Sequence, residues 1–257
     1  MAHRRVSAHV RGAVALLLLA CAPAPGSRAG TLVVIAPHPD DGEASCGGLI
    51  ANTVAAGDSV VVLEMTGGEL GVWGKSPDEA RAIRTAEARR AAARLGARAE
   101  FFGGLDGSLV SDAAGAARLG AILARLRPEV VVAPWPLDVH PDHQAAGQLA
   151  WRAFQDPATT FTLYFYETTN APHTRSFGFV PTDYVDITGA LAAKREATLL
   201  HASQNPAEWF DLYANLALVH GYAADVTHAE GYVRARNGSG LGGRGERTAR
   251  TLPAQRE

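Results

Sequence analysis

The side chains best suited to chemistry stand in two short clusters, and each cluster directly follows an apolar run. The first combines two prolines, a histidine and three carboxylates in the order Ala36-Pro37-His38-Pro39-Asp40-Asp41-Gly42-Glu43. Prolines fix the backbone angle φ, so they stiffen this loop and hold the polar side chains between them in set directions. Histidine with carboxylate is a ligand set of catalytic zinc sites, which leave one position to water. Taken alone, the cluster could also be a solvated acidic turn.

The second cluster has the same character and makes the acidic turn a weaker explanation. It reads Pro134-Trp135-Pro136-Leu137-Asp138-Val139-His140-Pro141-Asp142-His143. Because two such clusters are hard to explain as separate turns, we expect one site built from both. His143 also stands where the next helix would begin, so its ring can be aimed back across the strand ends.

These clusters must be held by the elements around them, and apolar runs alternate with helical segments along most of the chain. Strands are expected at residues 31–36, 59–65, 99–102, 129–133 and 161–167, and helices at residues 47–56, 78–95, 113–126 and 143–154. The strand runs are mostly apolar, as in strands buried on both faces. This order predicts a single-domain, Rossmann-like α/β fold with a mostly parallel sheet and helices on both faces. Ligands of such sheets lie beyond the carboxyl ends of the strands, where both clusters stand.

The two clusters and several weaker segments resemble the PIG-L/LmbE family of zinc-dependent N-acetylglucosaminyl deacetylases. The family's hallmark motifs correspond to Pro37-His38-Pro39-Asp40-Asp41-Gly42-Glu43 and to His140-Pro141-Asp142-His143. Weaker matches are Ile83-Arg84-Thr85-Ala86-Glu87 with Leu95-Gly96, Asp106-Gly107, and Lys194 with His201-Ala202-Ser203-Gln204. The resemblance covers most of residues 31–233. One departure is Gly42, because many members have glutamate directly after the aspartate pair.

The resemblance implies a metal site. His38, Asp41 and His143 would bind Zn²⁺ as its three protein ligands, with Fe²⁺ as the alternative native metal. Such a metal polarises the acetamide carbonyl and lowers the pKa of the attacking water toward about 7.

The resemblance also implies catalytic roles for three residues. Asp40 would be the general base that takes the proton of the attacking water, since neighbouring residues of an extended loop point in different directions. His140 would stabilise the oxyanion or protonate the leaving amine, and Asp142 would hold the tautomer of His140.

Three further residues are expected to contact the substrate. Arg84 would grip a sugar hydroxyl or a phosphate, Asp106 would contact sugar hydroxyls, and Glu43 would supply the acid that follows the aspartate pair. Arg84 has the alternative role of an exposed helix cation beside Glu87, and Asp106 that of shaping its glycine turn.

Aromatic residues offer candidates for sugar stacking and for the core. Trp73, in the glycine-rich loop at residues 67–75, is the better candidate for stacking on a sugar, with a loop anchor as the alternative. Trp209, Phe210 and Tyr213 stand at helical spacing and are expected in the core.

The composition of the 257 residues sets outer limits on the function. Hydrophobic residues make up 47% and charged residues 19%, a balance typical of a folded domain and not of a disordered chain. The formal net charge is −2, which argues against a nucleic-acid-binding protein. Two cysteines, Cys21 and Cys46, exclude a disulfide scaffold.

The two ends of the chain differ from the domain expected at residues 31–236. Residues 1–30 have a basic start and a short apolar run, as in an export signal, with an amphipathic leader or a misread start codon as the alternative. Cleavage before Cys21 would leave a lipid-anchored N-terminus, whereas ordinary cleavage near Ala29 would leave a free one. The protein is therefore expected to be secreted, periplasmic or lipid-anchored outside the cell membrane. The glycine-rich residues 237–257 are expected to be a flexible tail.

Three hypotheses for the function follow. The leading one is an exported metal-dependent hydrolase that removes an acyl group from an N-acetylated amino sugar or a related glycoside. The second is a metal-dependent amidase acting on a non-sugar N-acyl conjugate, and the third is a binding protein with a degenerate metal site. Asp40 and His140 disfavour the third, because a mere metal site would need neither. The expected partner is thus a small molecule, with membrane attachment only through Cys21. The oligomeric state is not predicted.

Overall fold

The structure is a computed structural model that describes residues 30–156, 158–169 and 176–236. Almost all of the expected export signal and the whole expected tail at residues 237–257 lie outside the described residues. Within the described ranges, no helix is long and apolar enough to cross a membrane.

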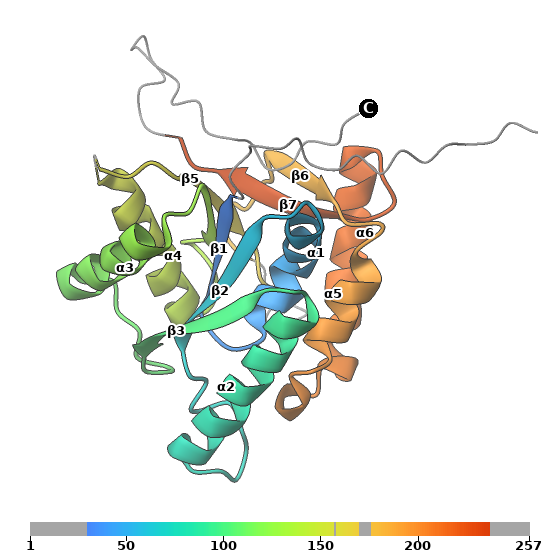
Figure 1. The fold of residues 1–257 in the computed structure, drawn as a ribbon. Coiled ribbons are helices and arrows are strands. Elements are labelled where there is room, and N and C mark those ends of the chain that lie inside the picture. Colours follow the sequence, from blue (N-terminus) through green and yellow to red (C-terminus); the bar gives the residue numbers. More distant parts are fainter. Residues whose placement is uncertain (1–29, 157, 170–175, 237–257) are drawn as a thin grey trace, which may run out of the picture.

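One seven-stranded sheet organises the described part of the chain, with the strands in the order β3-β2-β1-β4-β5-β7-β6 (Figure 1). The strands are β1 (Thr31–Ala36), β2 (Ser59–Thr66), β3 (Arg98–Gly104), β4 (Val130–Pro134), β5 (Thr162–Tyr166), β6 (Asp183–Asp186) and β7 (Ala229–Arg234). Strands β1 to β5 pair in parallel, whereas β7 runs antiparallel to both β5 and β6. The expected mostly parallel sheet is therefore confirmed.

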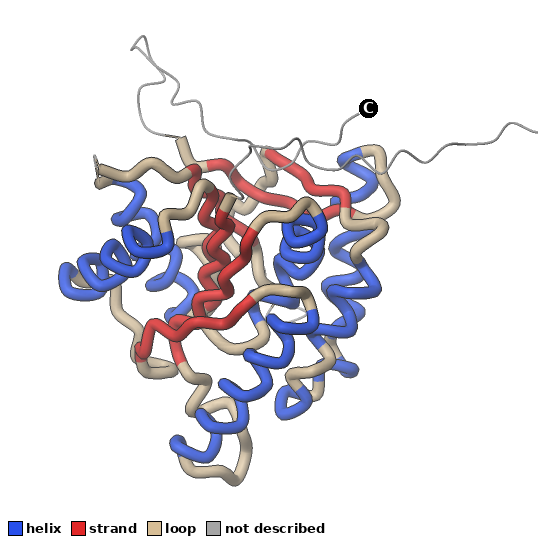
Figure 2. The backbone as a smooth tube through the Cα atoms, in the orientation of Figure 1, coloured by secondary structure: helices blue, strands red, loops and turns tan. Residues whose placement is uncertain are grey.

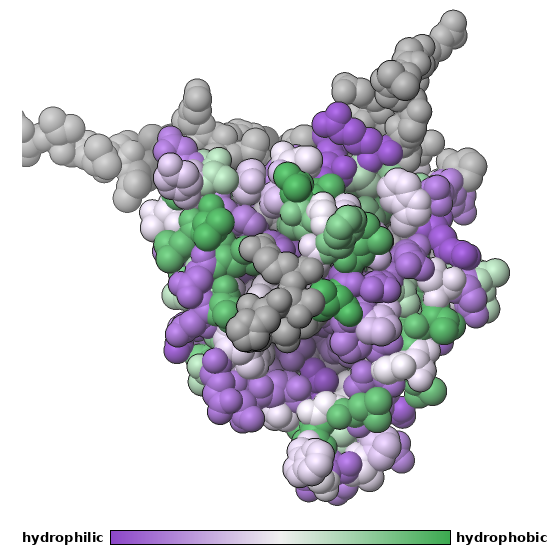
Figure 3. All heavy atoms as spheres, turned by 180° about the vertical axis from the view of Figure 1, so that it is seen from behind, coloured by the Kyte–Doolittle hydropathy of each residue, from purple (hydrophilic) through white to green (hydrophobic). Residues whose placement is uncertain are grey.

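Helices cover both faces of the sheet (Figures 1 and 2). On one face lie α1 (Asp41–Ala55), α2 (Pro77–Arg94), α5 (Leu191–Thr198) and α6 (Phe210–Ala224), and on the other lie α3 (Ala113–Leu126) and α4 (Pro141–Gln155). Two short 3₁₀ helices, η1 (Ala202–Gln204) and η2 (Pro206–Glu208), lead into α6. The outer surface seen from behind mixes hydrophilic side chains with separate hydrophobic patches (Figure 3).

The strand residues divide between two hydrophobic cores because successive side chains point to opposite faces of a sheet. In β1, Val34 packs with α1 residues such as Leu49, whereas Val33 and Ile35 pack with α3 and α4 residues such as Leu149. All five of these side chains are fully buried. Burial on both faces explains why the central strands read as apolar runs without alternation.

The sequence predicts that the first helix begins at residue 47. In the structure, α1 begins at Asp41. Glycines at positions 42, 47 and 48 weaken the helical pattern. Packing of α1 against the sheet needs a small residue at position 42, because a Cβ atom at Gly42 would lie 2.9 Å from Cγ1 of Val62. The early start of the helix places Asp41 in its first turn.

The C-terminal elements were not among those expected, which end at residue 167. The structure adds β6, α5, α6 and β7. The segment β6 reads DYVD and β7 contains Glu230-Gly231, so neither shows the apolar run that identified the other strands.

The strand order reverses between β1 and β4, which lie side by side in the sheet. Parallel α/β sheets bind ligands at such a reversal, beyond the carboxyl ends of the two strands. The first polar cluster follows β1 and the second follows β4, so the fold brings the two clusters together at this edge of the sheet.

Candidate active site

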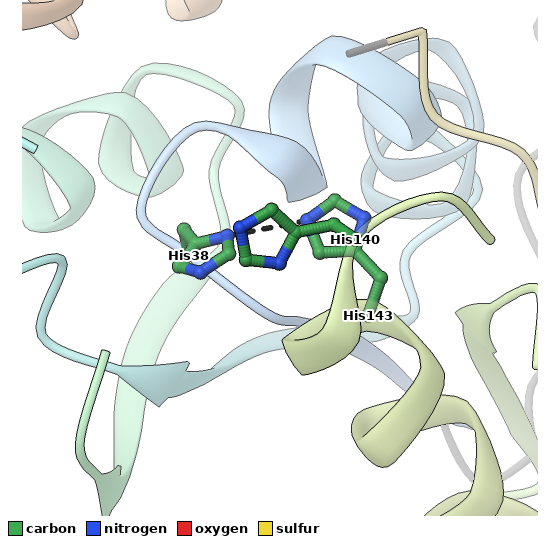
Figure 4. A group of neighbouring side chains, drawn as sticks. All are labelled: His38, His140 and His143. Carbon is green, nitrogen blue, oxygen red and sulfur yellow. Dashed lines mark hydrogen bonds between the residues drawn. The ribbon is translucent and has the colours of Figure 1, made fainter. Parts of the chain in front are cut away.

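Three side chains from the two clusters point one atom each toward a common centre. His38 lies in the loop after β1, Asp41 in the first turn of α1 and His143 in the first turn of α4. Nδ1 of His38 lies 3.2 Å from Oδ2 of Asp41 and 3.2 Å from Nε2 of His143. Nε2 of His143 lies 3.1 Å from the same Asp41 oxygen. Figure 4 shows the two imidazoles facing each other beside His140, with a dashed line between His38 and His143.

The outward nitrogen of His143 is held by two residues. Nδ1 lies 3.0 Å from Oγ1 of Thr168 and 3.3 Å from Oδ1 of Asp138. Thr168 donates its own hydroxyl proton to Oδ2 of Asp138 at 2.6 Å, so its oxygen is an acceptor for the imidazole N–H. This arrangement places the ring proton on Nδ1 and leaves a lone pair on Nε2, toward the centre.

The outward nitrogen of His38 is held in the same way. Nε2 lies 3.0 Å from Oδ2 of Asp142 and 3.2 Å from Oδ1 of Asp106. Asp142 also accepts the backbone N–H groups of Gly107 and Leu109, at 2.7 Å and 3.0 Å. Two carboxylates therefore keep the proton on Nε2 and leave the lone pair of Nδ1 facing the centre.

These contacts test whether the residues fit a metal ion. When both imidazoles are neutral, their two lone pairs and a carboxylate oxygen converge without a proton to share, an arrangement that a cation stabilises. A tetrahedral ion with bonds of about 2.0–2.1 Å separates its ligand atoms by about 3.3 Å, close to the distances between these atoms. His38, Asp41 and His143 can therefore hold a metal ion.

Two further groups in the described residues bring ligand atoms within 4.8 Å of one another. They are His38 with His140 and His143, and His38 with Asp106 and Asp142. In the second group the two carboxylates hold the outward nitrogen of His38, which makes them supports of a ligand.

The charges of the site favour a positive centre. Burial by itself raises the pKa of Asp41, but His143 and His38 hold it well below its usual value. Burial lowers the pKa of His143, whereas Asp41 and Asp138 raise it to about 9. The carboxylate is thus kept ionised, and the cluster stabilises positive charge beside it.

Asp40 lies beside the metal-ligand candidates in an unusual backbone conformation. Its φ of 129° lies in a region that residues other than glycine rarely occupy, at a cost of about 1–3 kcal/mol. Its Oδ2 atom lies 3.2 Å from Nη2 of Arg84. Burial raises the pKa of Asp40 to about 6, against the opposing effect of Arg84. Asp40 is therefore a carboxylate that can accept a proton near neutral pH.

His140 occupies the N-cap position of α4, before Pro141. Its Nδ1 accepts the backbone N–H of Asp142 at 3.2 Å, which leaves the ring proton of a neutral His140 on Nε2. Burial lowers the pKa of His140, as do the positive charges of His38 and His143. The predicted pairing of the Asp142 carboxylate with His140 is thus corrected: the carboxylate binds His38, because α4 starts between the two residues and turns its side chain away from His140.

The three metal-ligand candidates, Asp40 and His140 open into one cleft of about 550 Å³. Its walls are formed by His38, Asp40, Asp41, Ala44, Leu70, Gly71, Arg84, Asp106, Gly107, His140, His143, Thr169, Gln204, Trp209, Leu212 and Tyr213. The predicted substrate residues Arg84 and Asp106 are among them. Arg84 is buried, so its alternative role as an exposed helix cation is wrong. Asp106 lies between the cleft and His38, and its Oδ2 accepts the N–H of Leu70 at 3.0 Å.

Glu43 does not line the cleft, and the expectation that it contacts the substrate is corrected. Its side chain is fully buried, and its Oε2 lies 3.1 Å from Nε2 of His201. Because α1 begins at Asp41, Glu43 stands two residues into the helix and points into the protein instead of into the loop.

Several residues of the site were missed or misplaced by sequence reasoning. Asp138 and Thr168 hold the imidazole of His143. The one feature of the sequence that could have indicated them is that each closely follows a strand. Trp209 was expected in the core but is half-buried in the cleft wall, whereas Phe210 is buried as expected. Trp73, the preferred stacking candidate, is fully exposed and does not line the cleft.

Comparison with known proteins agrees with this geometry. The sequence profile of the PIG-L family, described as GlcNAc-PI de-N-acetylase, matches residues 33–154. The chain is 28% identical to the diacetylchitobiose deacetylase of Thermococcus kodakarensis over 228 residues, which cover 78% of this chain and 81% of that protein.

Two solved structures share the fold over most of their length. The conserved protein TT1542 from Thermus thermophilus is 33% identical with a TM-score of 0.68, over 79% of this chain and 93% of that one. The N,N'-diacetylchitobiose deacetylase from Pyrococcus horikoshii is 26% identical with a TM-score of 0.71, over 80% of this chain and 84% of that one. With both hallmark motifs at the strand reversal, the chain belongs to the PIG-L family.

Proposed function

We propose that this protein is a metal-dependent hydrolase that removes the acetyl group from an N-acetylated amino sugar or a related glycoside. The observation that carries the proposal is the convergence of His38, Asp41 and His143 in the cleft that also holds Asp40 and His140. Membership of the PIG-L family and the similarity to a diacetylchitobiose deacetylase support the choice of bond and substrate.

His38, Asp41 and His143 would hold the metal, which we propose to be Zn²⁺, with Fe²⁺ as the alternative. When bound, such a metal supplies Lewis-acid activation of the acetamide carbonyl and of the attacking water. Asp106, Asp142, Asp138 and Thr168 would keep the two imidazoles in the tautomers that binding requires.

Asp40 is proposed as the general base. With a pKa of about 6, it is mostly ionised at neutral pH and is still basic enough to take a proton from water. Arg84 holds the carboxylate in place through the contact of 3.2 Å. The proton taken from water is then available for the nitrogen of the scissile amide, which leaves as a free amine while acetate forms.

His140 is proposed to stabilise the negative charge that develops on the carbonyl oxygen. A neutral imidazole with its proton on Nε2 is a hydrogen-bond donor, and the lowered pKa of His140 favours that state. Arg84 and Asp106 would contact substrate hydroxyls from their positions in the cleft wall.

The experiment is release of free amine from diacetylchitobiose and from N-acetylglucosamine, before and after removal of metal by a chelator. The proposal predicts release, loss of release after chelation, and recovery on adding Zn²⁺ or Fe²⁺. Cleavage of non-sugar N-acyl conjugates alone would favour the second hypothesis, a metal-dependent amidase, over an amino-sugar deacetylase. Activity that is indifferent to chelation with proven metal loss would contradict the metal-dependent mechanism.

We also propose that the protein is exported, on the strength of the basic and apolar pattern of residues 1–30. Fractionation of cells expressing the C-terminally tagged chain tests this, with mass spectrometry of the N-terminus to separate a lipid-modified Cys21 from cleavage near Ala29. Tagged protein found wholly in the cytosol with residues 1–30 attached would contradict export.

A further inference from the structure

The cleft has a second wall that the proposed reaction does not use. The first wall carries the histidines and carboxylates and is polar. The second wall is mostly apolar and consists of Leu70, Trp209, Leu212 and Tyr213. Leu70 comes from the loop after β2, and the other three come from the start of α6 and the residue before it. An apolar wall beside a polar one is typical of pockets that bind ligands with both kinds of surface.

Trp209 is fixed in this wall by its own indole nitrogen. Nε1–H donates to the backbone carbonyl of Gln204 at 2.8 Å. Its ring packs at an angle of 63° to the ring of Tyr213, with the ring centroids 5.8 Å apart. Because the only polar group of the indole is already satisfied, Trp209 can offer a ligand only the surface of its aromatic ring.

Gln204 ties this tryptophan to the rest of the cleft. Its side-chain amide donates to the carbonyl of Gly71 at 2.9 Å, in the same loop as Leu70. The neighbouring Ser203 donates its backbone N–H and its hydroxyl to the buried carboxylate of Glu87 in α2, at 2.9 Å and 2.6 Å. Trp209 is thus held relative to α2 and the loop after β2, so little freedom remains to be lost when a ligand packs on it.

We propose that Trp209 is the platform on which the sugar ring of the substrate stacks, and that it sets the preference for N-acetylated sugars over open-chain amides. This inference rests on the proposed function. A pyranose ring has C–H groups on its face and hydroxyls around its edge. The face matches the indole and Leu212, while Asp106 and Arg84 in the same cleft can take the hydroxyls.

Kinetics with two substrates test the platform. The full chain, Trp209→Ala and Trp209→Phe are compared on N-acetylglucosamine and on N-acetylethanolamine, which has the same amide but no ring. Trp209→Ala should raise KM for the sugar about three- to tenfold, leave the open-chain amide nearly unchanged, and be partly rescued in Trp209→Phe. The matched control is Trp73→Ala, because Trp73 is fully exposed outside the cleft and should change neither constant. Equal losses on both substrates, or no loss on the sugar, would overturn the platform.

A binding measurement separates this inference from the deacetylase itself. Chitobiose, the free-amine disaccharide, should bind the full chain in a calorimetric titration, and its affinity should fall in Trp209→Ala and stay the same in Trp73→Ala. Binding that depends on Trp209 without amine release would support the platform and contradict the proposed reaction. Amine release that is unaffected in Trp209→Ala would support the proposed reaction and contradict the platform.

Discussion

The carboxylate of Asp142 lies 3.0 Å from Nε2 of His38, although 104 positions separate the two residues in the chain. This contact joins the loop after β1 to the first turn of α4. Asp142 of the second polar cluster thereby orients His38, a metal-ligand candidate of the first cluster. Asp142 is therefore a positioning residue, and its carboxylate fixes the tautomer of His38.

Asp142→Asn is expected to weaken metal binding about 10–100-fold, because the amide is a poorer acceptor for the imidazole N–H. Competition with a chromophoric chelator measures the affinity. Asp225→Asn is the matched control, since Asp225 is exposed at the end of α6. Unchanged metal affinity in Asp142→Asn would contradict the positioning role.

His140→Ser is expected to lower kcat about 10²–10³-fold while the metal content stays the same. Serine is a good N-cap residue, so the start of α4 is preserved and the lost imidazole is the main change. Steady-state kinetics with metal analysis measures both quantities. If the variant kept its kcat, stabilisation of the oxyanion by His140 would be wrong.

The buried pair of Glu43 and His201 is expected to serve stability. Burial lowers the pKa of His201, but Glu43 raises it above its usual value, so Glu43 stabilises the charged form of His201. Glu43→Ala should cost about 3–5 kcal/mol in the free energy of unfolding, because the His201 charge loses its partner.

Denaturant unfolding measures this loss. Asp78→Ala is the control, because Asp78 forms an exposed ion pair with Arg81 that should be worth about 1 kcal/mol or less. A large rise in KM for Glu43→Ala without loss of stability would restore the original expectation that Glu43 contacts substrate.

Glu64 of β2 is expected to make the protein less stable as the pH rises. Both of its carboxyl oxygens are buried without a hydrogen-bond partner among the described residues, and burial raises its pKa well above the usual value. The folded state therefore retains a proton that the unfolded state releases above about pH 4.3, and stability falls from there upward, by about 1.4 kcal/mol for each unit of difference in pKa.

Glu64→Gln removes this titration. Its melting temperature should exceed that of the unmodified protein by a margin that grows between pH 4 and pH 8. Thermal melts across this range measure the margin, and a constant margin would show that Glu64 is not protonated in the folded state.

The central sheet and the meeting of the two clusters could be predicted because they depend on local patterns. Apolar runs mark β1, β2 and β4, and parallel strands bring their carboxyl ends to one edge. The convergence of His38, Asp41 and His143 follows from that edge once the motifs are found.

The errors share a physical cause, since they depend on where helices begin and on contacts distant in sequence. The start of α1 at Asp41 turns Glu43 into the protein, and the start of α4 turns Asp142 toward His38. Trp209 has the spacing of a core residue, and contacts such as those of Gln204 with Gly71 and of Ser203 with Glu87 bring its segment to the cleft. Such contacts leave no periodic signal.

The most direct test of the proposed metal-dependent reaction compares metal content and amine release in the unmodified chain, Asp40→Asn and Asp41→Asn. We expect about one metal ion per chain and amine release from diacetylchitobiose for the unmodified protein. Asp40→Asn should keep the metal and lose about 10²–10⁴-fold in rate, whereas Asp41→Asn should lose the metal as well. An unmodified chain that binds no metal, or an Asp40→Asn variant that hydrolyses the substrate at the full rate, would contradict it.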